Sequence, residues 1–270
     1  MQELLQERNA ARDAPTEREF QLLYNAAFGS DSYIRQTEDR FLVYGTGRYG
    51  LRSGEELHFL HGFEEEWLDR DRKVIKVPAH VDCDCRYCHE RAEDIASRRE
   101  ETPEEIRELY WQPKYEASVR VIPYGWSAES IDVVERFADD VGGFSYAQST
   151  LNRRLSELQK RAGLEGKLYP HALRAAAGFF WARQGLEAVY LQALMGWQDM
   201  RIANRYIRAT GQQLNDRVND LMNVDSSIDK EQPQVEQQDL PDPTEEVYNR
   251  TGRADKASDQ NTTLSHWLES

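Results

Sequence analysis

The sequence contains no long apolar run, no apolar segment at its start and only three cysteines. Its 270 residues have a mean hydropathy of -0.80, and no stretch approaches the roughly 20 apolar residues that span a bilayer. The first ten residues, MQELLQERNA, lack the apolar core of a signal peptide. These absences exclude a membrane-spanning protein and predict a soluble, cytoplasmic chain with no membrane partner.

The three cysteines lie in one short cluster. An odd number of cysteines argues against a disulfide scaffold and fits a reducing compartment. Cys83, Cys85 and Cys88 occur in the segment HVDCDCRYCH, flanked by His80 and His89. Three thiolates and one histidine can bind zinc. The sequence therefore leaves two interpretations open: an ordinary reduced loop, or a structural zinc site whose candidate ligands are Cys83, Cys85, Cys88 and His89 and which braces an insertion between two strands.

The sequence also contains an ordered set of motifs between residues 171 and 207. HALR begins at His171 and ends at Arg174, MGW ends at Trp197, and NRYI contains Tyr206, nine positions after Trp197. A histidine and an arginine three positions apart lie on one face of a helix. Taken singly, each residue has an ordinary structural explanation, and only the ordered set indicates a site that gathers positive charge around one anionic group.

Three short helices are expected to carry these motifs. Ala172–Gln184 reads as a helix that ends at Gly185, and Glu187–Met195 as one that ends at Gly196. A third helix should contain Tyr206. The glycines act as stop signals, because they adopt the left-handed conformation that follows many helices.

This arrangement resembles the tyrosine recombinase, or phage integrase, family. Members carry H-x-x-R, then G-H or G-W, then a nucleophilic tyrosine nine residues on. The resemblance also requires an earlier arginine followed three residues later by an acidic residue, and Arg52 with Glu55 fits this first box best. Arg48, which directly follows a Thr-Gly pair, is a competitor for the same role.

The resemblance implies a lysine on a β-hairpin between the first box and H-x-x-R. Lys114 fits, in the turn-like Pro-Lys-Tyr-Glu between the expected strands Leu109–Gln112 and Ser118–Tyr124. The family's catalytic set would then be Arg52, Lys114, His171, Arg174, Trp197 and Tyr206.

The chemistry of phosphodiester cleavage explains these residue types. Two guanidiniums, those of Arg52 and Arg174, can hold the non-bridging oxygens while staying charged. Tyr206 needs a base to act as nucleophile, since a phenol has a pKa of about 10, and His171 is the candidate base or relay. By resemblance Lys114 protonates the leaving 5′ oxygen. Trp197 stands where histidine is more frequent; its indole N–H can only donate, so it can contact a phosphate oxygen or buttress the tyrosine.

The resemblance implies an α+β fold, mainly α, with a small antiparallel sheet. A Thr-x-x-Glu capping box at Thr16–Glu19 predicts a helix start. Further expected elements are helices over Arg40–Gly45, Ala128–Asp140 and Ala147–Ala162 and a strand over Lys73–Pro78. One face of the Ala147–Ala162 helix bears a row of cations that could contact phosphates or simply be solvated: Arg153, Arg154, Lys160 and Arg161.

The net charge of -14 is unusual for a protein that grips DNA. Half of it lies in the tail, where eleven acidic residues face four basic ones from Asp225 onwards, and only seven of the 34 cations are lysines. Acid-rich, lysine-poor composition resembles adaptation to a very salty cytoplasm, where carboxylates maintain hydration and counterion release adds little to DNA affinity. The rival interpretation is that the acidic body does not bind DNA.

The predicted organisation is a lead-in over residues 1–13, a catalytic domain over 14–224 and an acidic, disordered tail over 225–270, whose end LSHWLE could dock on a neighbouring copy. The expected function is a site-specific integrase of a viral or mobile element, acting on double-stranded DNA attachment sites as a tetrameric synaptic complex and needing no cofactor for catalysis. Relatives usually carry a DNA-clamping domain first, so an accessory DNA-binding factor is a further expected partner. A type IB topoisomerase or resolvase, or a catalytically silent DNA-binding regulator, remains an alternative.

Overall fold

The computed structural model describes residues 9–61, 64–81, 83, 85–98, 102, 111–113, 115–166 and 168–210. The first half contains helices α1 (Glu17–Ala27), α2 (Tyr33–Gly47), α3 (Ser53–His58), α4 (Glu64–Trp67) and α5 (Arg86–Ala96), with strands β1 (Leu68–Asp69) and β2 (Val74–Val77). The second half contains a 3-10 turn η1 (Glu116–Ser118), strand β3 (Arg120–Pro123) and helices α7 (Ala128–Asp140), α8 (Gln148–Arg161), α9 (Pro170–Arg183), α10 (Ala188–Met195) and α11 (Met200–Thr210). The expected mainly helical fold with a small sheet is confirmed.

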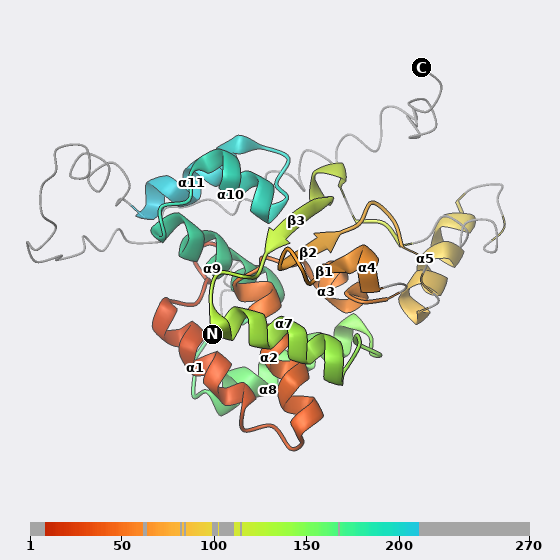
Figure 1. Ribbon diagram of the computed structural model, residues 1–270, viewed down its shortest axis with the longest axis horizontal. Coiled ribbons are helices and arrows are strands. Elements are labelled where there is room, and N and C mark those ends of the chain that lie inside the picture. Colours follow the sequence, from red (N-terminus) through yellow and green to blue (C-terminus); the bar gives the residue numbers. More distant parts are fainter. Residues whose placement is uncertain are drawn as a thin grey trace, which may run out of the picture.

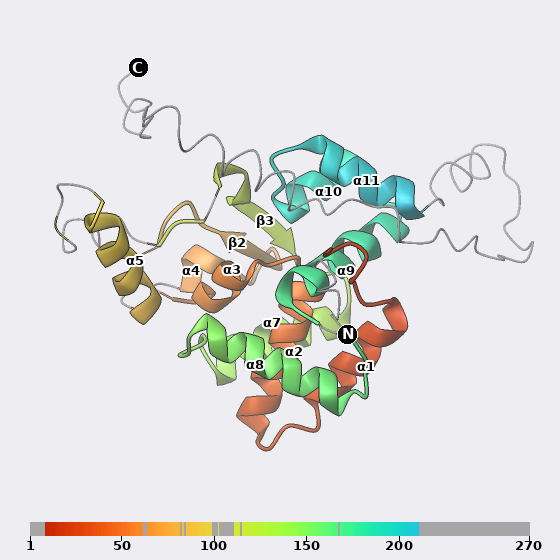
Figure 2. The same ribbon diagram turned by 180° about the vertical axis from the view of Figure 1, so that it is seen from behind.

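Helix α2 forms the centre of the helical body. It lies behind α7 in Figure 1 and behind α8 in Figure 2, so the two helices cover opposite sides of it. The interior is strongly aromatic: Phe41 of α2 stacks on Phe59 and on Phe137 of α7, with ring centroids 4.8 and 4.1 Å apart. Such offset contacts add to the free energy gained by burying large rings. This core fixes α2, whose end leads directly into the segment that carries Arg52.

A second, smaller core joins α9, α10 and α11. These helices contribute four alanines and six larger residues, and the core also includes Ala10, Ala11 and Ala14 from the segment before α1. The small side chains on α9 allow α10 and α11 to approach closely, and all three helices lie together at the end of the molecule next to β3 (Figure 1).

Local signals in the sequence set several helix ends as expected. Thr16 and Glu19 form the capping box of α1, with the Thr16 amide donating to Glu19 Oε2 at 2.7 Å. Helix α7 has the expected bounds. Helix α2 begins earlier than expected, at Tyr33, because the hydroxyl of Ser32 caps it.

The sheet corrects one expectation. Its strands are antiparallel in the order β1-β2-β3, and β3 pairs with β2 in the register Ile75↔Ile122. The strand expected over Ser118–Tyr124 therefore pairs with β2, and Leu109 and Tyr110 of its expected partner lie outside the described residues. Of that second segment, Trp111 makes an isolated bridge to Val81. The alternation of apolar residues in a strand specifies its buried face but not its partner, so the sequence alone could not assign this pairing.

Helix α8 corrects the expectation of an exposed row of cations. Leu151, Leu155 and Leu158 are buried as expected, but Arg154 is only 1% exposed and donates to Asp39 at 2.8 Å and to Glu38 at 2.6 Å. It is a buried ion-pair partner of α2 and not part of an exposed cationic row, since a charged side chain is buried only where it is paired.

No helix within the part of the chain that the structure describes is both long and apolar enough to cross a membrane.

Candidate active site

Arg52 occupies the position just before helix α3. Its backbone N–H donates to Glu55 Oε2 at 2.9 Å, so Glu55 caps the start of the helix that Arg52 precedes. The guanidinium donates to Glu55 Oε1 at 2.7 Å, to Ser118 Oγ at 2.8 Å and to the carbonyl of Gly196 at 2.8 Å. The side chain of Arg52 thus joins α3, η1 and the end of α10.

Glu55 is buried between two arginines. Arg120 of β3 donates to its Oε2 at 2.8 Å and to its Oε1 at 3.1 Å, opposite the contact from Arg52. Burial would raise the pKa of Glu55, but the charges of Arg120 and then Arg52 outweigh it and lower the pKa to about 2. Glu55 is therefore ionised at any physiological pH, and it is the carboxylate that balances the positive charge of this region.

Arg120 is a site residue that the sequence motifs did not reveal. Besides the pairs to Glu55, its guanidinium donates to the carbonyls of Leu194, Ser118 and Gly50, at 2.8, 2.8 and 3.0 Å. A buried arginine holding three backbone segments is a positioning residue. The only signal in the sequence was a charged residue within the apolar alternation Val-Arg-Val-Ile, which is unusual at an inward-facing position of a strand.

Helix α9 presents the next two residues of the set. Pro170 opens the helix, where its missing N–H costs nothing. His171 is exposed on this first turn, and Arg174, one turn later, is buried and donates through Nη2 to the carbonyl of Met195. Its Nε has no hydrogen-bond partner among the described residues.

Arg174 lies in a crowded electrostatic environment. Burial is the main reason that its pKa is well below the ordinary value of arginine, and the charge of Arg52 lowers it further. Glu55 acts in the opposite direction, as does Tyr206. Three guanidiniums, those of Arg52, Arg120 and Arg174, lie near one ionised carboxylate, that of Glu55. The site therefore has excess positive charge and is able to accept an additional negative charge.

The end of α10 is where the two arginines meet. Gly196 ends this helix with a φ of 60°, the left-handed conformation expected from the sequence. A Cβ at this position would lie 2.9 Å from the carbonyl oxygen of Ala117, so only glycine fits. The carbonyls of Met195 and Gly196 receive Arg174 and Arg52 respectively, which brings guanidiniums from α9 and from the start of α3 to the same turn.

Tyr206 lies on α11 with its ring between aromatic neighbours. It is buried, and its ring stacks on that of Trp197, with centroids 4.9 Å apart and an interplanar angle of 19°. The centroid of the Phe179 ring lies 4.7 Å from that of Tyr206. Gly178 of α9 makes room for it: a Cβ there would lie 2.9 Å from two carbons of the Tyr206 ring. The indole of Trp197 therefore supports the phenol ring, one of the two roles expected for it.

Two further candidates from the sequence are the competitor Arg48 and the hairpin lysine Lys114. Arg48, the competitor of Arg52, has its guanidinium over the rings of Phe20 and Phe180 and is paired with Glu17, on the side of α1. These contacts direct the guanidinium of Arg48 towards α1 and α9. Lys114 lies outside the described residues, so its position relative to Tyr206 stays a prediction.

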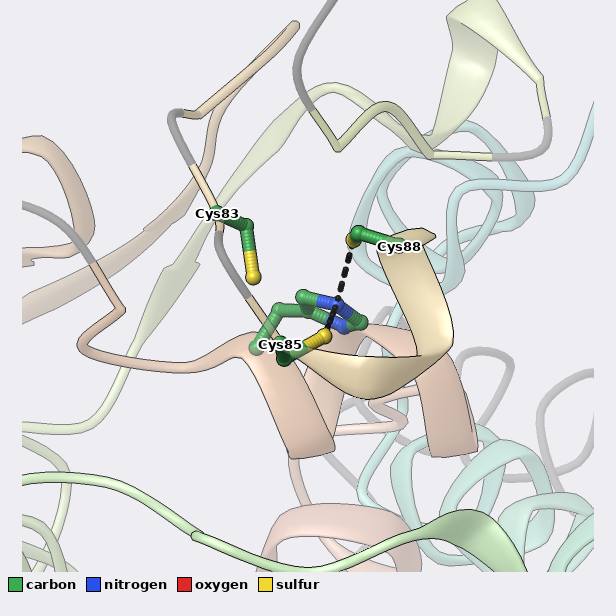
Figure 3. A group of neighbouring side chains, drawn as sticks. Cys83, Cys85 and Cys88 are labelled. Carbon is green, nitrogen blue, oxygen red and sulfur yellow. Dashed lines mark hydrogen bonds between the residues drawn. The ribbon is translucent and has the colours of Figure 1, made fainter. Parts of the chain in front are cut away.

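The cysteine cluster gathers around a histidine that the sequence did not indicate. Side-chain atoms of His58, Cys83, Cys85 and Cys88 lie within 4.8 Å of one another and form a group that could hold a metal ion. The three sulfurs converge on one point, with contacts to Cys85 and Cys88 dashed in Figure 3. His58, the last residue of α3, takes the place expected for His89. Neighbouring residues of a helix point about 100° apart, so Cys88 and His89 of α5 cannot both face the cluster.

The thiols of this cluster influence one another. Hydrogen bonds from the Cys85 and Cys88 thiols are the main reason that the pKa of Cys83 lies well below its usual range, with His58 and His61 adding to the effect against burial. The pKa of Cys88 is raised by the same contacts. The cluster therefore favours a thiolate, the form in which cysteine binds metal.

Comparison with known proteins agrees with this geometry. Residues 143–213, which include α8 to α11, match the sequence profile of the phage integrase family. Comparison with the curated proteins gives no match.

Solved structures resemble most of the chain. The crystal structure of XerA recombinase aligns with 77% of this chain and 64% of its own, at 16% identity and a TM-score of 0.51. The Tn1549 transposon integrase bound to transposon right end DNA aligns with 77% of this chain and 66% of its own, at 19% identity and a TM-score of 0.51. A complex of that integrase with circular intermediate DNA gives 20% identity and a TM-score of 0.50. The chain thus spans just under two thirds of the length of these structures, and at such identities the likeness concerns the fold. The segment that carries His171, Arg174, Trp197 and Tyr206 therefore matches the phage integrase family, and the chain has the fold of a tyrosine recombinase catalytic domain.

Proposed function

We propose that this chain is a site-specific DNA recombinase, an integrase that cleaves and rejoins strands through a 3′-phosphotyrosine intermediate. The observation that carries the proposal is the meeting of Arg52 and Arg174 at the end of α10, next to the helix of Tyr206. Arg174 is buried with an unpartnered Nε. A buried donor without an acceptor costs about 1–3 kcal/mol, and a non-bridging phosphate oxygen is an acceptor that would satisfy it.

In the proposed reaction, Tyr206 Oη attacks the phosphorus of a DNA phosphodiester. The bond from phosphorus to the phenolic oxygen forms as the bond to the 5′ oxygen breaks, so the energy of the phosphodiester is retained for rejoining. Arg52 and Arg174 stabilise the charge that grows on the non-bridging oxygens. The phenol proton passes to His171 as base or relay, and Lys114 protonates the 5′ oxygen as it leaves. Trp197 holds the tyrosine ring, and no cofactor takes part.

The positioning of the two guanidiniums is supported by Glu55 and Arg120. Without Glu55, Arg52 and Arg120 would face each other without a counter-ion, and their repulsion would move Arg52 away from the end of α10. Glu55 is therefore proposed to act through Arg52 and not on the substrate itself.

The proposed partners are double-stranded DNA attachment sites, a tetrameric assembly on DNA and an accessory DNA-binding factor. Two of the similar structures contain DNA, the transposon right end and a circular intermediate, which supports DNA as the substrate here. The proposed setting is the cytoplasm of a host with high internal salt, integrating or excising a viral or mobile element, as the acidic composition suggests.

A nicked suicide substrate tests the proposal, because loss of the short strand beyond the cleavage point traps the covalent intermediate. The wild-type chain should form a protein–DNA adduct, and Tyr206→Phe should form none while binding DNA nearly as well, since it removes one oxygen and keeps the stacked ring. An adduct from the Phe variant would refute the assignment of the nucleophile. The assay is run at low salt and in molar KCl; failure in KCl would contradict the high-salt setting alone.

The same assay separates the alternatives. An adduct together with recombinant product identifies a recombinase, whereas an adduct with relaxation of supercoils and no strand exchange identifies a topoisomerase-like enzyme. DNA binding with no adduct would identify a catalytically silent regulator.

We also propose that the ion of the cysteine cluster is zinc and that it is structural. Three sulfurs and one imidazole nitrogen are the donors that zinc prefers in closed, four-coordinate sites. Elemental analysis should find about one zinc per chain, and a chain purified without any metal would contradict this assignment.

A further inference from the structure

We propose that the metal site formed by His58, Cys83, Cys85 and Cys88 positions Arg52, because His58 and Arg52 lie at opposite ends of the same short helix. Binding of the metal does not depend on the recombinase proposal. The role of Arg52 does depend on it, so the tests below read the structure of α3 and not only DNA cleavage.

The first step is that His58 is prepared to be a ligand. Its Nδ1 lies 2.6 Å from the carbonyl oxygen of Gly54. A carbonyl can only accept, so Nδ1 carries a hydrogen, and Nε2 is the nitrogen that can bind a metal. Nε2 is the atom that faces the sulfurs, 3.4 Å from Cys85 Sγ and 3.3 Å from Cys88 Sγ. A backbone carbonyl on the second nitrogen is the usual way in which metal-binding histidines are oriented.

The second step is that the four ligands need little movement to surround an ion. The ligand atoms lie within 4.8 Å of one another, and around a tetrahedral zinc with Zn–S bonds of about 2.3 Å the sulfurs are about 3.8 Å apart. Cys85 caps α5 and Cys88 lies in its first turn, where the helix dipole favours thiolates. The ring of His58 is buried and stacks on Trp111 with centroids 4.8 Å apart, so one side of the cluster is shielded from water.

The third step is that α3 needs support at both ends. It has six residues, and a helix of this length is not stable without tertiary contacts. Its N-terminal end is held by Arg52, through Gly196 and Ser118. Its C-terminal end is His58. A metal that binds Nε2 fixes this second end, and it also ties to α3 the segment containing α5, which projects from the side of the molecule in Figures 1 and 2.

The consequence is a mechanical connection from the metal to the site. When the metal is bound, the axis of α3 is fixed at His58, and the guanidinium of Arg52 is directed to the end of α10. When the metal is absent, the C-terminal end of α3 loses its link to the cysteines but keeps the packing of His58 on Trp111 and of Phe59 on Phe41. Arg52 and the buried Glu55 are therefore held less firmly.

The first experiment measures the ligands. Full-length protein is stripped with a chelator and titrated with Co²⁺, whose thiolate charge-transfer and tetrahedral d–d absorption report the site. The wild-type chain and the control His89→Gln should bind about one Co²⁺ with the same spectrum. His58→Gln and Cys85→Ser should bind at least about 10-fold more weakly, the smallest loss seen even for outer-shell changes. Wild-type affinity in His58→Gln would overturn the ligand assignment.

The second experiment measures the connection on wild-type protein, so it does not depend on a variant that folds. Hydrogen exchange of the α3 amides, Ser53–His58, is compared with metal bound and after chelation, with α1, Glu17–Ala27, as the internal control. Exchange in α3 should accelerate by at least about 10-fold, since its local stability depends on the ion, and exchange in α1 should not change. Equal protection of α3 in both states would overturn the proposal, whereas an ion-dependent α3 in a chain that forms no DNA adduct would overturn the proposed function and leave this inference standing.

Discussion

Two consecutive buried glutamates, Glu55 and Glu56, should differ strongly in the stability lost on replacement by glutamine. Both side chains are almost completely buried. Glu55 faces Arg52 and Arg120, whereas Glu56 accepts a hydrogen bond from the hydroxyl of Thr46, at 2.6 Å. Burial raises the pKa of Glu56 well above its ordinary value, with the neighbouring charge of Glu55 adding to the shift. Glu55 is therefore ionised at neutral pH, whereas burial favours the protonated form of Glu56.

The magnitude follows from the environment of Glu55. The decrease of its pKa from 4.5 to about 2 corresponds to about 3 kcal/mol of stability, at about 1.4 kcal/mol for each pKa unit. Removal of one partner of a buried ion pair independently suggests about 3–5 kcal/mol, because the remaining charges are left uncompensated. Glu55→Gln should therefore lower the free energy of unfolding by about 3 kcal/mol. Glu56→Gln removes no ion pair, keeps the shape of the side chain and retains an oxygen that can accept from Thr46, so it should cost less than about 1 kcal/mol.

The pH dependence has a defined sign. The pKa of Glu55 is lower in the folded chain than in the unfolded one, so its contribution is fully present above about pH 4.5 and is lost as the pH falls towards 2. Urea unfolding followed by circular dichroism between pH 7 and pH 3 measures both effects. Compared with the wild type, Glu55→Gln should lose less stability on acidification. Equal costs for the two variants at pH 7, or an unchanged acid dependence in Glu55→Gln, would refute the assignment of the charge to Glu55.

Two further substitutions test the geometry of the site. Arg52→Ala should reduce adduct formation by a factor of about 100 or more, by analogy with the loss of a donor to a transition-state oxyanion, while Arg48→Ala, which loses its contacts with Phe20 and Glu17, should mainly lower the melting temperature; the opposite pattern would mean that Arg48 is the first-box arginine. Gly178→Ala should displace the ring of Tyr206, since its Cβ would lie 2.9 Å from that ring, and should slow adduct formation with little change in DNA binding; unchanged cleavage would show that the ring position is not critical.

The amino-acid sequence by itself determined the local elements and the order of the motifs. The capping box at Thr16 and the glycine stop at Gly196 act through backbone groups within a few residues, so they can be recognised without knowledge of the fold. The helices that carry Arg174 and Tyr206 were predictable for the same reason, and their ordered spacing indicated the family.

Only the tertiary structure decided which distant residues meet. His58 is 25 positions before the first cysteine of its cluster, and Arg120 is 65 positions after its partner Glu55. The partner of β3 and the buried pairing of Arg154 with α2 are likewise contacts between distant segments. Local patterns specify which face of an element is apolar, but a buried charge, ligand or strand edge is satisfied by whatever group the packed chain brings within a few ångströms. That selection is a property of the whole fold.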